Sequence, residues 1–261
     1  MDLNLQGKNA LVCGSSKGIG KAAALELAKL GANVTLVSRS ANIMSDILHE
    51  LDQTKDQQHD FLIADFTDSF DLRKKVHTLC QRKPIHILIN NTGGPPGGPI
   101  AEAKEEEFLQ AFNNHLICNH ILTKLVIKGM KEEGFGRIVN IISTSVRIPI
   151  DGLGVSNTTR GAVASWAKTM ANELAPYGIT VNNVLPGFTS TDRLHAIIQS
   201  RASKREISIE EQQKVMEASV PMRRFGKPEE VAAAIAFLAS PAASYITGTS
   251  MIVDGGRTRA I

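Results

Sequence analysis

Short runs of β-branched and apolar residues alternate along the chain with longer segments in which apolar positions recur at helical spacing. This alternation is typical of βαβ units around a parallel sheet. The short runs lack strict polar alternation, which favours strands covered by helices on both faces. The strands expected on this basis span residues 10–13, 33–38, 60–64, 85–90, 137–142, 180–185 and 251–254.

Helical segments are expected between these strands. The last of them begins with Pro228, Glu229 and Glu230, and both proline and acids are favoured in the first turn of a helix. We therefore predict an α/β fold of the doubly wound, Rossmann type, with helices on both faces of a parallel sheet. The helices expected span residues 18–30, 41–54, 69–82, 105–132, 155–175 and 228–239.

One polar and charged segment, residues 190–224, interrupts this rhythm. Within it, Ser208 and Glu211 form a capping-box pattern that predicts a second short helix. An insertion after a late strand of an α/β sheet lies at the edge where ligands bind, so we expect a mobile substrate lid, with a solvated surface excursion as the alternative. No linker or repeat divides the chain, and residues 1–261 are expected to form one domain.

Composition and charge narrow the class of protein. Hydrophobic residues make up 43% of the chain and charged residues 21%, as in an ordinary globular protein. The net charge is +3 without a basic arm, so nucleic acid is not an expected partner. No apolar run reaches the roughly 18 residues of a membrane span, and no signal peptide is visible. We expect a cytoplasmic protein with no membrane partner. Its three scattered cysteines suggest no metal site.

A glycine-rich turn follows the first expected strand and leads straight into a helix. It reads Gly14-Ser15-Ser16-Lys17-Gly18-Ile19-Gly20. Glycines let the backbone approach a pyrophosphate, while the free N–H groups and the positive dipole end of the helix bind the anion. In this context the turn predicts a dinucleotide site, with an ordinary tight turn as the alternative.

From this turn onward the sequence resembles the classical short-chain dehydrogenases/reductases over nearly its whole length. The resemblance implies a seven-stranded parallel sheet in the order 3-2-1-4-5-6-7 and hydride transfer between a nicotinamide cofactor and a carbonyl or alcohol substrate. It also implies a homotetramer or dimer, paired through the last strand and two long helices. The family markers appear in order as Asn90-Asn91-Thr92-Gly93, Gly136-Arg137-Ile138-Val139-Asn140-Ile141, Pro186-Gly187, Thr247-Gly248 and Asp254-Gly255-Gly256.

The end of the second strand bears on the choice between NAD(H) and NADP(H). An NAD site has an acid there for the ribose 2′-hydroxyl, whereas an NADP site needs a cation for the 2′-phosphate. This strand ends Val37-Ser38-Arg39-Ser40, without an acid, and Lys17 in the glycine turn adds a second cation. NADP(H) is therefore expected over NAD(H), although either cation alone could be a solvated surface residue.

Further cofactor contacts are implied by the resemblance. Asp65 and Phe66 would flank the adenine, Asn91 and Gly93 would line the path to the nicotinamide ribose, and Thr189 would contact the carboxamide. The full set of expected cofactor-binding residues is Gly14, Ser16, Lys17, Gly18, Ile19, Gly20, Arg39, Asp65, Phe66, Asn91, Gly93, Arg160, Pro186, Gly187 and Thr189.

The pattern departs from the family at the catalytic residues. The family uses a serine that holds the substrate oxygen, a tyrosine that moves the proton, a lysine that binds the ribose and lowers the pKa of the tyrosine, and an asparagine that positions a water. Alignment on the Gly136 marker gives Ser143, Ser156, Arg160 and His115 at these positions. Only the serine is retained.

Three functions remain open. In the first, an active oxidoreductase, Ser143 and Ser156 hold the carbonyl oxygen, Arg160 stabilises an oxyanion, and His115, titrating near neutrality, supplies a proton. The second is a catalytically weak or inactive NADP(H)-binding module, and the third is a partner subunit of an active relative. His115 could equally be a buried structural histidine, and Ser156 with Arg160 a polar pair on a helix.

The substrate class is also open. The segment 93–99, rich in glycine and proline, is expected to form a stiff wall of the cleft or a rigid connection. Related 3-oxoacyl-carrier-protein reductases bear cations beside the cleft, but the matching positions here, Gly134 and Tyr177, are not basic. The basic residues of the lid, Arg201 among them, are balanced by neighbouring glutamates. No charged substrate is implied.

Overall fold

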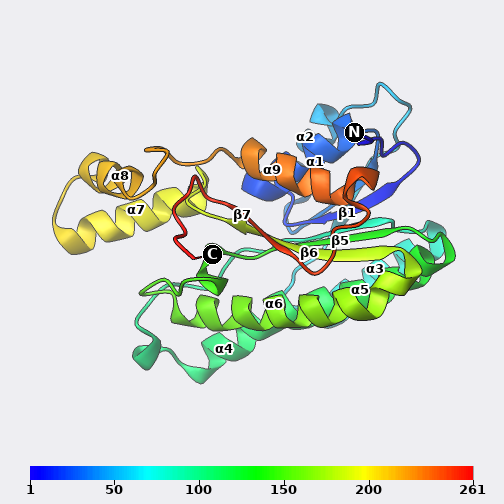
Figure 1. Ribbon diagram of the computed structural model, residues 1–261. Helices are drawn as coiled ribbons and strands as arrows, with labels where there is room; N and C mark the ends of the chain where they lie inside the picture. The colour runs from blue at the N-terminus through cyan, green and yellow to red at the C-terminus, as the bar shows by residue number, and fades with distance from the viewer. Residues whose placement is uncertain (261) are drawn as a thin grey trace.

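The computed structural model describes residues 1–260, which contain a seven-stranded parallel sheet (Figure 1). The strand order is β3-β2-β1-β4-β5-β6-β7, and every neighbouring pair is parallel. This confirms the predicted Rossmann-type sheet and its order. The strands are β1 (Asn9–Cys13), β2 (Asn33–Ser38), β3 (Asp60–Ile63), β4 (Ile87–Asn90), β5 (Gly136–Ile141), β6 (Ile179–Pro186) and β7 (Ser250–Val253).

Helices cover both faces of the sheet, and each face has its own hydrophobic core (Figure 1). Neighbouring residues of β1 belong to opposite cores: Val12 to the first and Leu11 to the second, and both are fully buried. A strand buried on both faces needs no polar alternation, as its sequence indicates. The first core packs against α1 (Gly18–Lys29), α2 (Ala41–Glu50) and α9 (Pro228–Ala239), and the second against α3 (Ser69–Arg82), α5 (Cys118–Glu132) and α6 (Gly154–Leu174).

Two helices differ from their expected ranges by more than one residue at an end. The helix α2 ends at Glu50, short of residue 54, because the Asp52 carboxylate accepts hydrogen bonds from the backbone N–H and hydroxyl of Thr54 and offers the chain a local turn instead. The expected helix 105–132 is broken into α4 (Glu105–Phe112), a π-helical turn (Asn113–Ile117) and α5. Such wider turns often mark functional sites.

The lid segment forms a helical hairpin of α7 (Asp192–Arg205) and α8 (Ile209–Ala218), at the left of Figure 1. The predicted capping box is present: the Ser208 hydroxyl accepts the Glu211 backbone N–H at 3.1 Å, and the Ser208 N–H donates to the Glu211 carboxylate at 3.1 Å. The mobility expected of a lid stays a prediction. The hairpin has a small apolar cluster of its own, formed by Leu194, Ile198, Met216, Phe188 and Phe225.

Two features of the described residues bear on the class of site. None of their helices has the length and apolar character needed to cross a bilayer. Nor do residues 1–260 contain three His, Cys, Asp or Glu side chains placed to hold a metal ion. Of the cysteines, Cys13 and Cys118 are buried and Cys80 is partly buried, and burial raises the pKa of all three thiols.

Candidate active site and cofactor cleft

The expected cofactor residues meet at the carboxyl ends of the strands, where the strand order reverses between β1 and β4. A cavity of about 770 Å³, here called the glycine-turn cavity, lies over the ends of β1 and β2. Its volume is within the usual range for small-molecule and cofactor sites. The expected cofactor residues that line it are Gly14, Ser16, Lys17, Gly18, Ile19, Arg39, Asp65, Phe66, Asn91 and Gly93.

Close packing explains the first and last glycines of the turn. Gly14 has a φ of +59°, and a Cβ there would lie 2.7 Å from the Asn91 carbonyl oxygen. A Cβ on Gly20 would lie 2.1 Å from the Gly14 carbonyl oxygen. The Asn91 side-chain amide donates to the carbonyl oxygens of Cys13 and Gly14 at 3.3 and 3.2 Å. Asn91 therefore fixes the turn besides lining the cavity, and Gly20 acts by packing rather than as a lining residue.

The amino-terminal end of α1 is suited to an anion. The helix begins at Gly18, and the residue before it, Lys17, is extended and places no side-chain cap on the first turn. The first N–H groups of the helix are therefore left for a ligand, and the helix dipole adds positive potential there. Ser16, Lys17, Gly18 and Ile19 line the cavity at this point. These residues fit the pyrophosphate of a dinucleotide.

Two cations stand at the rim of the glycine-turn cavity. The Lys17 ammonium lies 2.9 Å from the Asp192 carboxylate, and the Arg39 guanidinium lies 3.8 Å from that of Asp65. Their side chains are 72% and 75% exposed, so both ion pairs are weak and readily exchanged. The Thr67 backbone N–H, followed by Arg39, lowers the pKa of Asp65.

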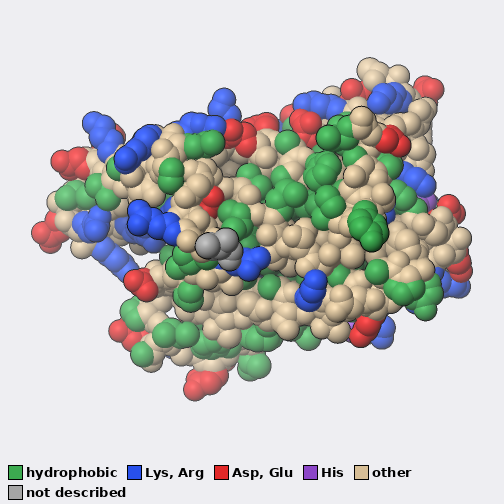
Figure 2. All heavy atoms as spheres, viewed as in Figure 1, with side chains coloured by type: hydrophobic (Ala, Val, Ile, Leu, Met, Phe, Trp, Pro, Cys, Tyr) green, Lys and Arg blue, Asp and Glu red, His purple; other side chains and the backbone are tan. Residues whose placement is uncertain are grey.

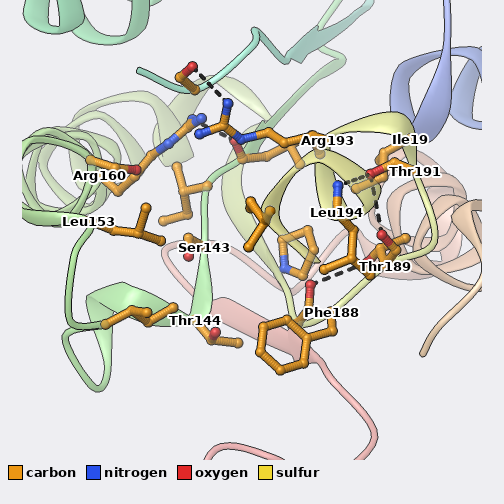
Figure 3. A pocket seen from close by; sticks show the side chains of 18 of the residues that line it. Ile19, Ser143, Thr144, Leu153, Arg160, Phe188, Thr189, Thr191, Arg193 and Leu194 are labelled. Carbon is orange, nitrogen blue, oxygen red and sulfur yellow. Dashed lines mark hydrogen bonds between the residues drawn. The ribbon is translucent and has the colours of Figure 1, made fainter. Parts of the chain in front are cut away.

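A second cavity of about 230 Å³, the Ser143 cavity, lies over the ends of β5 and β6 (Figure 3). It brings together Ser143, Ser156 and Arg160, three of the four catalytic candidates. Arg160 is also a cofactor candidate, and three further cofactor candidates, Pro186, Gly187 and Thr189, line the same cavity. The two cavities share Ile19, residues 91–94, Thr191 and Arg193, so a ligand can extend from one into the other.

The two serines come from different elements. Ser143 follows β5 and caps a 3₁₀ turn, its hydroxyl oxygen accepting the Ser145 backbone N–H at 3.1 Å. The Ser143 hydroxyl hydrogen is left to donate to a ligand. Ser156 lies one turn before Arg160 on α6, and this spacing places both side chains on the cavity side of the helix.

Arg160 is a buried cation. Its side chain is 8% exposed, and one guanidinium nitrogen donates to the Ile141 carbonyl oxygen at 3.0 Å. It forms no ion pair with any acid among residues 1–260. Burial, followed by the charge of Arg193, lowers the pKa of Arg160 to about 10, so it remains a cation at neutral pH. A buried cation of this kind can stabilise an oxyanion.

His115 lies behind the cavities rather than in their walls. It is 2% exposed inside the π-helical turn, and its Nδ1 shares a hydrogen bond with the hydroxyl of Thr92, which lines both cavities. Burial first, then Arg160 and Arg193, lower the pKa of His115 to about 2. The expectation that His115 titrates near neutrality is therefore wrong. The histidine stays neutral and holds the Thr92 hydroxyl in place.

Two arginines of the site were missed from the sequence. Arg193, in the first turn of α7, donates to the carbonyl oxygens of Gly94 at 3.1 Å and Pro95 at 2.7 Å and lines both cavities. Arg257, after β7, lies over the Phe188 ring at 4.2 Å and lines the Ser143 cavity. Neither belongs to a local motif. Among the described residues, the Ser143 cavity is lined by three arginines and by no acid, histidine, lysine or tyrosine.

Comparison with known proteins agrees with this fold and cleft. A family model described as "Enoyl-(Acyl carrier protein) reductase" matches residues 14–258. The chain is 36% identical to the 3-oxoacyl-[acyl-carrier-protein] reductase FabG of Vibrio cholerae, covering 97% of this chain and 98% of the relative. It is 31% identical to the NADPH-dependent reductase BacG of Bacillus subtilis, covering 97% and 99%.

A solved structure extends the likeness to three dimensions. The L-sorbose reductase of Gluconobacter frateurii, complexed with NADPH and L-sorbose, superposes with a TM-score of 0.93 at 27% identity, covering all of both chains. The sheet order, the glycine turn at the switch point and a likeness that runs the length of the chain lead to one assignment. The protein belongs to the classical short-chain dehydrogenase/reductase family of oxidoreductases.

Proposed function

We propose that the protein is an NADP(H)-dependent oxidoreductase that transfers a hydride between the nicotinamide and a carbonyl or alcohol group of a small molecule. The continuity of the two cavities carries this proposal, because a dinucleotide on the glycine turn would extend toward Ser143, Ser156 and Arg160. The names of the relatives in Vibrio cholerae and Bacillus subtilis, both reductases, support the same class of reaction.

The preference for NADP(H) over NAD(H) is part of the proposal. Its support is the pair of exposed cations, Lys17 and Arg39, at the rim of the glycine-turn cavity. The strand β2 ends at Ser38, and no acid follows in Arg39-Ser40 to bind a ribose 2′-hydroxyl. The Lys17 ammonium and the Arg39 guanidinium are groups suited to binding a 2′-phosphate.

A mechanism without the family's tyrosine and lysine follows from the residues present. When bound, NADPH supplies the hydride to the carbonyl carbon. Ser143 and Ser156 hold the carbonyl oxygen, and the Arg160 charge stabilises the alkoxide that forms. The Ser156 hydroxyl passes its proton to the alkoxide and takes one from water. An alkyl hydroxyl is a weak acid, so this arrangement lacks part of the roughly 10²–10⁴-fold contribution of a tuned general acid.

A specific observation favours a second function, an NADP(H)-binding module with little or no turnover. Among the described residues that line the Ser143 cavity there is no tyrosine, lysine or histidine to donate the proton directly. Such a module could act alone or as the partner subunit of an active relative. It would keep the glycine-turn cavity intact and lose only the chemistry of the Ser143 cavity.

One pair of measurements separates the two functions. NADPH oxidation is followed with a panel of aldehydes, ketones, quinones and 3-oxoacyl thioesters, while NADPH binding is titrated by fluorescence. The oxidoreductase is supported if turnover is observed and Arg160→Gln lowers it. The exposed control Arg147→Gln, on the neighbouring segment, should leave turnover unchanged. Tight binding with no turnover of any compound supports the module. Absence of binding contradicts both.

A homotetramer, paired through the last strand and two long helices, is the assembly we propose. β7 is an edge strand whose apolar residues Met251, Ile252 and Val253 are only partly buried. Leu109 on α4 and Tyr245 before β7 are also exposed, and Figure 2 shows hydrophobic side chains gathered over the region of α9 and β7. Sedimentation equilibrium tests the assembly, and a monomer at micromolar concentration contradicts it.

A further inference from the structure

A third cavity of about 380 Å³ continues the cleft outward. It shares Thr144, Ile150 and Arg257 with the Ser143 cavity and no residue with the glycine-turn cavity, so it lies at the opposite end of the path. Its walls come from the segment after β5, the lid hairpin and the chain after β7. In Figure 1 the red segment after β7 runs between the lid hairpin and the green segment that follows β5. We call this space the outer cavity.

Two arginines face the outer cavity without partners in residues 1–260. Neither Arg257 nor Arg201 forms an ion pair or a side-chain hydrogen bond there, and the Nε of Arg257 is buried and unbonded. By contrast, Arg224 of the same lid segment makes two bonds of 2.7 and 2.6 Å to the Glu230 carboxylate. The ring of Phe188 under Arg257 fixes its guanidinium. Burial first and then the charge of Arg201 lower the pKa of Arg257, whereas the charge of Asp254 raises it.

The remaining walls define what kind of anion fits. Among the described side chains that line the outer cavity, one acid, Asp151, stands against two arginines, an excess of one positive charge. Asp254 acts on Arg257 from outside this lining, where its carboxylate accepts the backbone N–H groups of Gly256 and Thr258. A monoanion such as a carboxylate matches that excess better than a phosphate dianion. Ile148, Pro149 and Ile150 form an apolar wall for an alkyl chain, and the next cavity inward has arginines and no acid among its described lining residues.

We propose that the substrate is an oxo acid, or in reverse a hydroxy acid, whose carboxylate binds Arg257 and Arg201 while its carbonyl lies at Ser143. The redox part rests on the proposed function: a hydride adds to the carbonyl carbon, a proton adds to its oxygen, and the carboxylate is unchanged. This revises the expectation that no charged substrate is implied. The charge of the lid balances along the sequence, but Arg201 faces the cavity while Glu206, Glu210 and Glu211 are exposed.

A binding experiment tests the outer cavity without any turnover. Isothermal calorimetry on the NADPH-loaded protein compares pentanoate with pentanamide, which have the same alkyl chain and nearly the same size but a charged and a neutral head group. The carboxylate is expected to bind at least about 10-fold more tightly, the usual advantage of a charge-assisted bond. Arg257→Gln should lower this preference, Arg257→Lys should keep more of it, and Arg259→Gln, on the exposed end of the same segment, should leave it intact. Equal affinities in the unmodified protein overturn the proposal.

A kinetic experiment then separates this inference from the proposed function. Oxo acids with increasing distance between carbonyl and carboxylate are compared with their methyl esters by kcat/KM. Acids favoured over esters by about 10-fold or more, with this ratio lowered in Arg257→Gln and unchanged in Arg259→Gln, support both proposals. Equal reduction of acids and esters supports the oxidoreductase and overturns the proposal that the substrate is an oxo acid. Carboxylate-selective binding with no turnover supports the anion site and contradicts the oxidoreductase.

Discussion

The glycine-turn cavity and the Ser143 cavity are joined but built in different ways. The first is shaped by backbone: a turn pressed against Asn91, an uncapped helix end, and exposed cations at the rim. The second is shaped by side chains, two serines and a buried arginine whose pKa burial lowers to about 10. Backbone geometry tolerates few residue types, whereas side-chain chemistry can be exchanged on the same scaffold. The two halves of one cleft can therefore change independently.

Gly20→Ala, which tests the backbone of the glycine-turn cavity, is expected to have the largest effect. The added Cβ would lie 2.1 Å from the Gly14 carbonyl oxygen, and only a shift of the turn itself can relieve that contact. We expect NADPH affinity, measured by fluorescence titration, to fall by about 100-fold or more. Gly161→Ala on α6 is the control, because a Cβ there meets nothing within 4 Å. Unchanged affinity in Gly20→Ala would mean that the turn does not hold the cofactor.

Arg160→Gln tests the other half of the comparison. Loss of a preorganised donor to an oxyanion is expected to lower kcat by about 10²–10³-fold. NADPH affinity should fall much less, because the glycine turn is untouched. Arg160→Lys, which keeps a charge in the buried position, should recover part of the rate. An equal loss of affinity and kcat in both variants, with normal circular dichroism, would refute the separation of the two cavities.

Arg39→Ser tests which nucleotide the glycine-turn cavity prefers. A charge-assisted bond to the 2′-phosphate is typically worth about 1.5–3 kcal/mol, so NADPH affinity should fall by about 10- to 100-fold. NADH affinity should stay the same, since NADH has no phosphate there. Parallel fluorescence titrations with both nucleotides provide the measurement. Equal losses of affinity for NADPH and NADH would mean that Arg39 does not act on the 2′-phosphate.

His115→Gln is expected to have the smallest effect, visible as a pH dependence of stability. The folded state holds the pKa of His115 at about 2, below the ordinary value of 6.5, so below pH 6.5 only the unfolded state takes up the proton. The free energy of unfolding then falls with decreasing pH by up to about 1.4 kcal/mol per pH unit. Urea denaturation at about pH 7 and pH 5 should show a shallower fall in His115→Gln, and no change in slope for the exposed control His77→Gln. Identical slopes in all three proteins would show that His115 titrates freely.

Local signals made much of this molecule predictable. The helix α3 begins where expected because the Asp68 side chain caps its first turn, accepting the backbone N–H groups of Phe70 and Asp71. The glycine turn was found for a similar reason, since the strand, turn and helix that form it are contiguous.

Long-range contacts explain what was not predicted. The π-helical turn is held by Asn113, whose amide donates to the Phe66 carbonyl oxygen, and by the bond between His115 and Thr92. Arg257 reaches the cleft only because β7 ends beside β6. Nothing in the neighbouring residues marks these positions, and the burial that suppresses the charge of His115 arises from tertiary packing.

The bond between Lys17 and Asp192 has a consequence for the timing of events in the cleft. Lys17 both lines the glycine-turn cavity and anchors the first turn of α7 through Asp192. A phosphate of the proposed cofactor would compete with Asp192 for the Lys17 ammonium, next to Arg193, which bonds to the carbonyl oxygens of Gly94 and Pro95. Because the pair is exposed, salt weakens it as well. The contact between the glycine turn and the lid hairpin is therefore sensitive to the ionic strength of the solution.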